Sequence, residues 1–272
     1  MLSDRSYCGF QHNDDRFDSN NSTALDEYPW LVHILFADVE DEYNHFRDRC
    51  NGVLINNRYV LTTKYCAIFP ESVKLGQYDT NRTISCVNNT DLEECNEPIL
   101  KIPVENEIFR VDTLKGLDDF ALLRLAEKVT FTDYIRPICL PLDDSEVIER
   151  SELFFSGWGA HNESNITKKK LKYRPTDLSK CLELDVEKSQ VPSSVVPVCL
   201  KPERNNTVLV CSGDGSGPAM YSNKRMQWFA DSIITKVYYD ESVLNLCSNK
   251  MPIAGIKITM DVVEWILSVI RP

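Results

Sequence analysis

The chain has 272 residues, and its 43% hydrophobic content is enough to bury one or two sizeable cores. Its net charge of −11 argues against binding to nucleic acid or to an anionic membrane surface, because both attract positively charged patches. No run of about 18 apolar residues occurs, so no membrane span is expected.

In chain order, residues 1–16 are polar and proline-free, and they are predicted to form a linker tied down by Cys8. From Tyr28 onward, short β-branched and aromatic runs alternate with turn residues, which is typical of an all-β barrel or sandwich. Clear runs of this kind cover residues 28–36, 52–55, 58–61 and 120–123. The acidic segment 81–98 lacks periodicity and is predicted to be an exposed loop. Only the end is predicted to be helical, because apolar residues recur near a 3.6 period at Met260, Val263, Ile266 and Ile270.

Ten cysteines and seven glycosylation sequons together indicate a secreted glycoprotein. The even number of cysteines fits complete pairing, and disulfides persist in oxidising compartments. No C-x-x-C pair occurs and the four histidines stand apart, so neither a metal centre nor another cofactor is expected. The first residues lack the apolar core of a signal peptide, and we therefore expect a processed or truncated form. The sequons begin at Asn20, Asn21, Asn81, Asn88, Asn162, Asn165 and Asn205.

Three motifs resemble the catalytic segments of the chymotrypsin-like (S1) serine proteases. Residues 210–218, V-C-S-G-D-G-S-G-P, resemble the family's G-D-S-G-G-P signature, but Gly215 stands where that signature has the nucleophilic serine. Residues 60–66, V-L-T-T-K-Y-C, resemble T-A-A-H-C with the general-base histidine replaced by Tyr65. Asp119 begins D-F-A-L-L-R-L, similar to D-I-A-L-L-R-L, and keeps the third triad position. The resemblance therefore implies a protease fold that no longer cuts.

The resemblance covers almost the whole chain and implies two packed six-stranded antiparallel barrels with a C-terminal helix. We expect a pro-segment or linker over 1–16, barrels over about 17–130 and 131–259, and the helix over about 260–270. The resemblance also implies five disulfides, Cys8–Cys139, Cys50–Cys66, Cys86–Cys95, Cys181–Cys199 and Cys211–Cys247. The subgroup of arthropod clip-domain protease homologs is similar in the pairs Cys8–Cys139 and Cys86–Cys95 and in the segment L-G-Q-Y-D-T at 75–80, although this chain contains no clip domain.

Little catalysis is expected at these positions. Tyrosine has an ordinary pKa of about 10 and is a poor proton acceptor at neutral pH. Ser216 is an alternative nucleophile, but a shift of one residue exceeds the half-ångström or so that catalytic geometry tolerates. Asp119 is expected to be a buried carboxylate that bonds to the backbone or to the Tyr65 hydroxyl. Gly213 and Gly215 still offer oxyanion-hole amides, although a tight turn also requires glycine.

The resemblance implies a changed activation step. In the family, cleavage creates an N-terminal amine that pairs with the aspartate before the nucleophile, which is Asp214 here. Arg16 and Phe17 occupy the cleavage position without the glycines of the family's site, and the Asn20 sequon follows closely. We therefore expect no ordinary activation switch, and a cut after Arg16 is expected to expose a binding surface instead.

The resemblance also implies a changed specificity pocket. Arginine-specific members carry aspartate where this chain has Leu209, followed by Val210, and an apolar side chain cannot compensate a guanidinium charge. Thr235 and Lys236 replace the usual aromatic–glycine pair and are expected to block the edge where a substrate strand docks. Calcium is not expected after residue 75, because Gln77 offers a neutral amide where a glutamate ligand would stand.

These features predict a secreted pseudoprotease that acts as a regulatory cofactor or adaptor in an extracellular cascade, such as innate immunity or melanisation in a haemolymph-like fluid. Its partners would be active proteases, zymogens or a prophenoloxidase-like substrate. Two alternatives remain open: a divergent endopeptidase that uses Ser216, and a passive glycoprotein scaffold. The basic run Lys168–Lys172 predicts a solvated loop, which we favour, or an exosite for an acidic partner.

Overall fold

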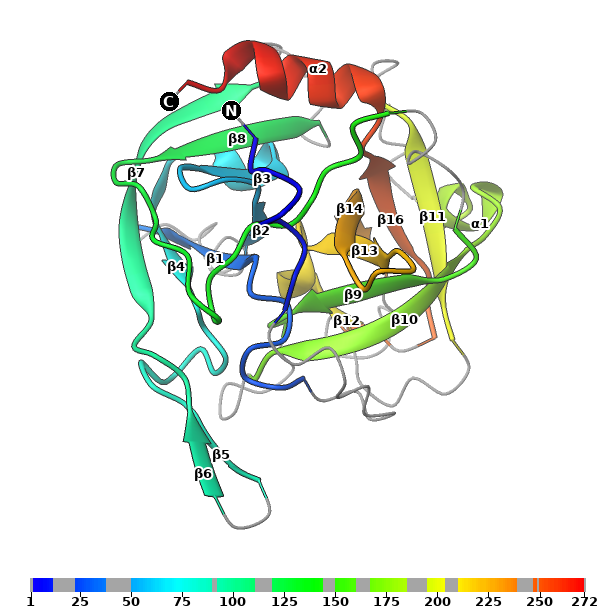
Figure 1. Ribbon diagram of the computed structural model, residues 1–272. Helices are drawn as coiled ribbons and strands as arrows, with labels where there is room; N and C mark the ends of the chain where they lie inside the picture. Colours follow the sequence, from blue (N-terminus) through cyan, green and yellow to red (C-terminus); the bar gives the residue numbers. More distant parts are fainter. Residues whose placement is uncertain are drawn as a thin grey trace.

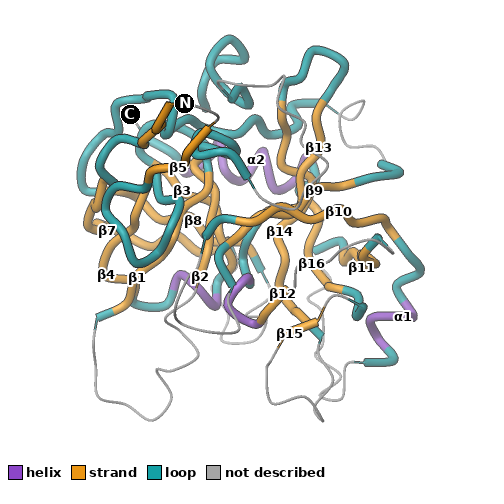
Figure 2. The backbone as a smooth tube through the Cα atoms, turned by 90° about the horizontal axis from the view of Figure 1, so that it is seen from below, coloured by secondary structure: helices purple, strands orange, loops and turns teal. Residues whose placement is uncertain are grey.

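The computed structural model has two six-stranded antiparallel barrels and a C-terminal helix, which confirms the expected fold (Figure 1). The barrels lie side by side in both backbone views (Figure 1 and Figure 2). The structure describes residues 2–11, 23–37, 50–89, 92–110, 119–143, 150–159, 167–184, 195–203, 210–238, 247–248 and 250–271. Among these residues, no helix is both long enough and apolar enough to span a membrane.

The first barrel closes in the strand order β1-β2-β3-β8-β7-β4. Its strands are rich in aliphatic and aromatic residues that suit a buried, pleated surface, and every residue of β2 and β3 is buried. The strands are β1 Leu31–Phe36, β2 Cys50–Leu54, β3 Tyr59–Thr63, β4 Pro70–Leu75, β7 Leu100–Phe109 and β8 Phe120–Leu125.

The second barrel closes in the order β10-β11-β16-β14-β13-β9. A short pair beside it, β12 Val210–Cys211 with β15 Cys247–Ser248, leads into the segment that resembles the nucleophile signature. The barrel strands are β9 Leu153–Gly157, β10 Lys169–Pro175, β11 Pro197–Pro202, β13 Pro218–Ser222, β14 Trp228–Val237 and β16 Ile253–Lys257.

Aromatic side chains join the two barrels. The Trp228 ring of the second barrel contacts Tyr28 edge-on at 5.2 Å between centroids and lies 6.3 Å from Trp30. The Trp30 indole N–H also points at the sulfur of Met220, 3.0 Å away. Such pairs add about 0.5–1.5 kcal/mol each beyond their buried area. Buried residues of both barrels belong to one cluster, so the core is continuous across the interface.

Two α-helices complete the described part of the fold. The helix α2, Met260–Val269, buries Val262, Val263 and Ile266, and it lies along the top of the molecule in Figure 1. A single turn, α1 Ser179–Leu182, carries Cys181. The described residues contain no free cysteine, and the five disulfides are Cys8–Cys139, Cys50–Cys66, Cys86–Cys95, Cys181–Cys199 and Cys211–Cys247, the pairs expected above.

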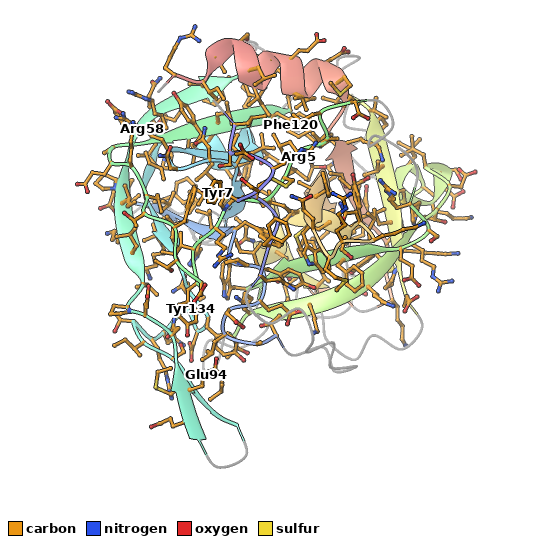
Figure 3. All side chains as sticks on the ribbon, viewed as in Figure 1. Arg5, Tyr7, Arg58, Glu94, Phe120 and Tyr134 are labelled. Atoms are coloured by element: carbon orange, nitrogen blue, oxygen red, sulfur yellow. A yellow bond between two sulfur atoms is a disulfide. The ribbon has the colours of Figure 1, made fainter. Side chains whose placement is uncertain are left out.

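Part of the segment predicted as an exposed loop is a hairpin, so that prediction was wrong for these residues. Strands β5 Cys86–Asn89 and β6 Leu92–Cys95 pair antiparallel, and the hairpin projects from the first barrel (Figure 1). Figure 3 places Glu94 on this arm and Tyr134 at its base, where the Tyr134 hydroxyl donates to the Cys95 carbonyl. The cross-strand Cys86–Cys95 disulfide supports the pairing that apolar alternation does not predict.

The N-terminal segment 2–11 is attached to the second barrel. Gly9 donates to the Pro137 carbonyl at 2.8 Å and accepts from the Trp228 amide at 2.7 Å. Gly9 has a φ of 71°, and a Cβ there would collide with the Trp228 backbone, so only glycine fits. Beside the Cys8–Cys139 bond, the Arg5 guanidinium lies 4.8 Å from the Phe229 ring centroid.

Candidate functional site

The three residues that stand at catalytic positions come together between the barrels. Tyr65 opens the short 3-10 helix η2, Tyr65–Ala67, and Asp119 directly precedes β8. Gly215 follows a second such helix, η3 Ser212–Asp214, which contacts both β2 and β14. The amide of Lys64, next to Tyr65, donates to the Asp119 carbonyl at 2.7 Å. The fold thus brings segments that are far apart in the sequence into contact.

The Asp119 carboxylate has an arginine as its partner. Its side chain is 2% exposed, and its Oδ1 accepts from Arg110 Nε at 2.8 Å and from the Phe120 amide at 2.7 Å. The backbone bond agrees with the expectation above, but sequence reasoning did not find Arg110. No spacing rule marks an arginine nine residues away. Arg110 directly follows β7 and Asp119 directly precedes β8, so the β7–β8 pairing brings them together.

Gly215 and Ser216 reverse the order of serine and glycine in the family signature. Ser216 has a φ of 62°, a left-handed conformation that favours glycine and costs other residues about 1–2 kcal/mol. Its side chain points inward: the residue is 2% exposed, and its Oγ lies 2.5 Å from Thr63 Oγ1 and 3.1 Å from Cys66 Sγ. The hydroxyl is therefore engaged inside the protein.

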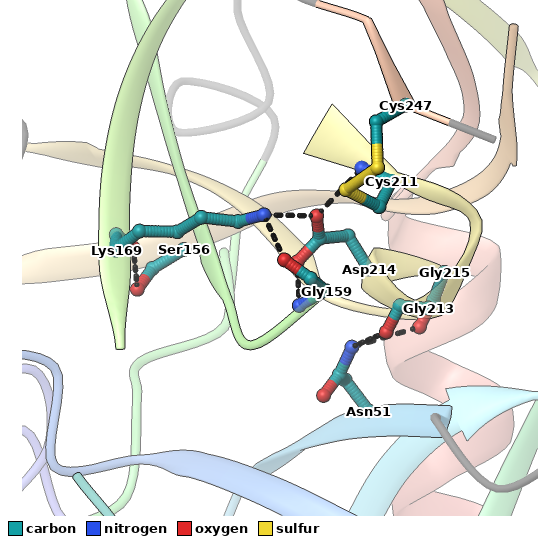
Figure 4. Close-up of polar contacts among 9 residues, drawn as sticks. All are labelled: Asn51, Ser156, Gly159, Lys169, Cys211, Gly213, Asp214, Gly215 and Cys247. Carbon is teal, nitrogen blue, oxygen red and sulfur yellow. Dashed lines mark hydrogen bonds and ion pairs between the residues drawn. A yellow bond between two sulfur atoms is a disulfide. The ribbon is translucent and has the colours of Figure 1, made fainter. Parts of the chain in front are cut away.

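Asn51 of β2 holds the turn from the first barrel. Its backbone amide donates to the Gly215 carbonyl at 3.2 Å, and its Nδ2 donates to the carbonyls of Gly213 and Gly215 at 3.1 and 3.2 Å (Figure 4). The two glycines assigned to an oxyanion-hole remnant are thus held by one side chain. No motif in the sequence indicated this role for Asn51.

The Asp214 carboxylate holds the turn from the second barrel. It is fully buried, and it accepts from the Gly159 amide at 2.6 Å and from the Cys211 amide at 2.9 Å. Lys169 of β10 forms an ion pair with it, with Nζ 2.6 Å from Oδ2 (Figure 4). A buried carboxylate requires such hydrogen bonds and a counter-charge to remain ionised.

The prediction for Lys168–Lys172 was wrong for three of its lysines, which form neither a solvated loop nor an exposed exosite. Lys168, Lys169 and Lys170 are 4%, 8% and 8% exposed. Lys168 donates to the Leu25 carbonyl at 3.2 Å, and Lys170 pairs with Glu27 at 3.0 Å. Each lysine thus meets an acceptor far away in the sequence. Burial lowers the pKa of Lys168 from 10.5 to about 8.

The remaining sequence-predicted positions are only partly described. Val210 is buried in β12, and Thr235 and Lys236 are half-buried in β14 at a shift in its pairing with β16. Asn81 lies on the surface. Outside the described residues lie Leu209, Arg16, Phe17, Asn20, Asn21, Asn162, Asn165 and Asn205, and the side chain of Asn88 is also not described.

The loop considered for calcium is held by hydrogen bonds from an amide. Gln77 Nε2 donates to the carbonyls of Asp79 and Thr80 at 3.5 and 3.3 Å, and its Oε1 lies 2.9 Å from His33 Nδ1. These carbonyls therefore face an N–H group, which offers no ligand to a cation. Among the described residues, the only group with metal-ligating spacing is Cys86, Glu93 and Cys95, whose cysteines form a disulfide.

Comparison with known proteins identifies the family of this chain. The family described as Trypsin matches residues 19–243. The chain is 30% identical over 233 residues to CLIP domain-containing serine protease B9 of Anopheles gambiae, covering 81% of this chain and 56% of that protein. It is 30% identical over 227 residues to phenoloxidase-activating factor 3 of Holotrichia diomphalia, covering 80% of this chain and 63% of that protein. The chain thus spans less than two thirds of the length of these two relatives.

A solved structure shares the fold. The crystal structure of the Drosophila Grass clip serine protease of the Toll pathway aligns with a TM-score of 0.74. That alignment covers 95% of this chain and 73% of the Grass chain at 21% identity.

Proposed function

Because the chain belongs to the trypsin family of serine proteases, we propose that it is a secreted, non-catalytic member that regulates an extracellular protease cascade. The observation that carries the proposal is the glycine at the nucleophile position, Gly215, opposite a phenol at the base position, Tyr65. Acyl transfer by this family needs a nucleophile and a base with a pKa near neutrality. Oxyanion binding and positioning alone give about 10³–10⁴-fold over the uncatalysed reaction.

The surroundings of the triad positions support the same proposal. Arg110 forms a buried ion pair with Asp119, so this carboxylate has a charged partner outside the catalytic positions. The alternative nucleophile, Ser216, is 2% exposed and engaged with Thr63, which argues against the divergent endopeptidase. A substrate carbonyl would have to displace buried packing to reach it.

We propose that the protein acts by binding other proteases, their zymogens or a prophenoloxidase-like substrate. Phe69 supports a binding role for the surface beside η2, since it closely follows that helix and is 83% exposed. It also has a φ of 55°, and a strained backbone that displays an aromatic ring on the surface is typical of a recognition site. The relatives include a phenoloxidase-activating factor, which supports a cascade of this kind.

Secretion into a haemolymph-like fluid with glycosylation is part of the proposal. Five disulfides require an oxidising compartment to form and persist. The exposed position of Asn81 leaves its sequon accessible to a glycan. Mass spectrometry of the secreted protein before and after glycosidase treatment tests this part, and a mass equal to the bare chain would refute it.

Active-site labelling tests the absence of catalysis. The glycosylated chain, uncut and cut after Arg16, would be treated with a fluorophosphonate probe and a broad peptide-substrate library, with trypsin as the positive control. We expect neither labelling nor turnover. Labelling that is lost in Ser216→Ala would refute the proposal and identify Ser216 as the nucleophile of an active enzyme.

Binding measurements separate an adaptor from a passive scaffold. We expect saturable binding to a protease, a zymogen or a prophenoloxidase, and a loss of about tenfold or more in affinity with Phe69→Ala. Leu267→Ala is the matched control, because Leu267 is also an exposed apolar residue, 49% accessible, but lies on α2. No saturable partner in any of the three classes would favour the scaffold.

A further inference from the structure

The fully buried Asp214 carboxylate lies in a closed polar site. Its two oxygens accept from the Gly159 and Cys211 amides and from the Lys169 ammonium. Gly157 and Gly159 close over it, since a Cβ at Gly157 would lie 2.6 Å from Oδ1 and one at Gly159 would overlap the carboxylate. Each of these glycines is therefore needed for the carboxylate to fit.

Lys169 is fixed in this site by its backbone as well as by its charge. Its Cα pairs with Gly157 in the β9–β10 ladder, and its carbonyl accepts from Ser156 Oγ at 2.6 Å. Besides the ion pair with Asp214, the ammonium donates to the Gly159 carbonyl. Strand pairing and two polar partners therefore hold the ammonium against the carboxylate (Figure 4).

We infer that Lys169 is the built-in counter-ion of Asp214 and that it fixes the 211–218 turn in one conformation, whether or not the chain is cut before the first barrel. The family resemblance assigns this role to a newly formed chain terminus, but here a side chain from the middle of the sequence fills it. Asn51 holds the same turn from the opposite side through the Gly213 and Gly215 carbonyls. The turn thus has fixed contacts to both barrels without any terminus.

This arrangement implies that cleavage does not regulate the conformation of the turn. An incoming amine would have to displace Lys169 from Asp214 and from the Gly159 carbonyl. It would also leave the displaced ammonium in the buried interior without its counter-charge, which is strongly unfavourable. Any effect of a cut must therefore arise elsewhere, at the cut segment itself.

Removing the ammonium tests the inference directly. Lys169→Ala should lower the melting temperature by roughly 6–20 °C and remove hydrogen-exchange protection from residues 211–218. Because the substitution deletes a three-carbon amine, millimolar n-propylammonium should restore part of both properties. Lys172→Ala is the matched control, since Lys172 lies on the same strand, is 41% exposed and pairs with Glu152. The Lys172→Ala variant should keep the wild-type melting temperature and exchange protection, and the amine should change neither.

Three results of this test would overturn the inference. The first is a Lys169→Ala protein with wild-type exchange at 211–218, and the second is a destabilised variant that n-propylammonium leaves unchanged. If Lys169→Ala does not fold, Lys169→Met with Asp214→Asn removes both charges and should recover folding relative to Lys169→Met alone. Absence of that recovery is the third contrary result.

The cut form provides a second test. A chain whose residues 12–16 are replaced by the recognition site of a specific protease can be cleaved completely before residue 17. We expect identical exchange at 211–218 before and after the cut, and a change in that segment alone would contradict the inference. This outcome is independent of the fluorophosphonate result, because the ion pair holds the turn whether or not the protein cuts peptides.

Discussion

The pairing of Arg110 with Asp119 predicts a large, non-additive effect of mutation on stability. The two side chains are 9% and 2% exposed, and Nε lies 2.8 Å from Oδ1. With an effective dielectric constant of about 20, the gross attraction is about 6 kcal/mol, but desolvation offsets most of it. Arg110→Met removes the attraction and leaves a buried carboxylate uncompensated. We expect it to lower the free energy of unfolding by about 3–5 kcal/mol.

A double-mutant cycle measures this effect. Urea unfolding with the disulfides intact would be followed for the wild type, Arg110→Met, Asp119→Asn and the double variant. The double variant should lie within about 1–2 kcal/mol of wild type, because no unpaired charge remains buried. Arg174→Met is the control: Arg174 pairs with Glu152 and Glu203 but is 53% exposed, so its loss should change stability by less than about 1 kcal/mol. Additive single effects, or Arg110→Met within about 1 kcal/mol of wild type, would refute the reasoning.

Three further predictions concern other buried groups. The folded-state pKa of Lys168, about 8, is below the unfolded value of 10.5, so the folded state binds fewer protons in this window and stability should rise with pH. Between pH 7.5 and 10, the free energy of unfolding in urea should rise by roughly 1–3 kcal/mol more for the wild type than for Lys168→Met. The same pH dependence of stability in both proteins would contradict this. Because Gln77 faces the loop carbonyls with an N–H group, millimolar Ca²⁺ or a chelator should move the melting temperature by less than about 1 °C, and a rise of several degrees would show a calcium site. Gly159→Ala should lower stability by about 3 kcal/mol or more, because its Cβ would lie 2.8 Å from the Asp214 amide nitrogen, and wild-type melting would contradict this packing.

The two barrels could be predicted because their evidence is local and repeated. Short apolar runs mark the strands, and motifs such as those around Asp119 and Gly215 match a family along most of the chain. The disulfide pairs came from that resemblance, since spacing alone allows many pairings among ten cysteines. The hairpin β5–β6 was missed because its strands have four residues each and no apolar face.

The polar network of the site could not be predicted, because its partners are far apart in sequence. A run of lysines ordinarily indicates a solvated surface, since a buried ammonium is costly without a partner. Here Lys168 and Lys170 meet acceptors near residues 25–27, 143 positions away, and Lys169 meets Asp214. Only the fold brings these pairs together. For the same reason, nothing in the sequence marked Asn51 or Arg110.

The disulfide between Cys8 and Cys139 has a practical consequence for anyone who assays processing of this protein. A cut anywhere between residues 11 and 23 leaves the short amino-terminal peptide covalently bound to the larger fragment. Gel electrophoresis without reductant would then score the cleaved material as intact, and two species would separate only after reduction. The peptide would also co-purify with the larger fragment at one copy per molecule, so a binding partner would always meet both.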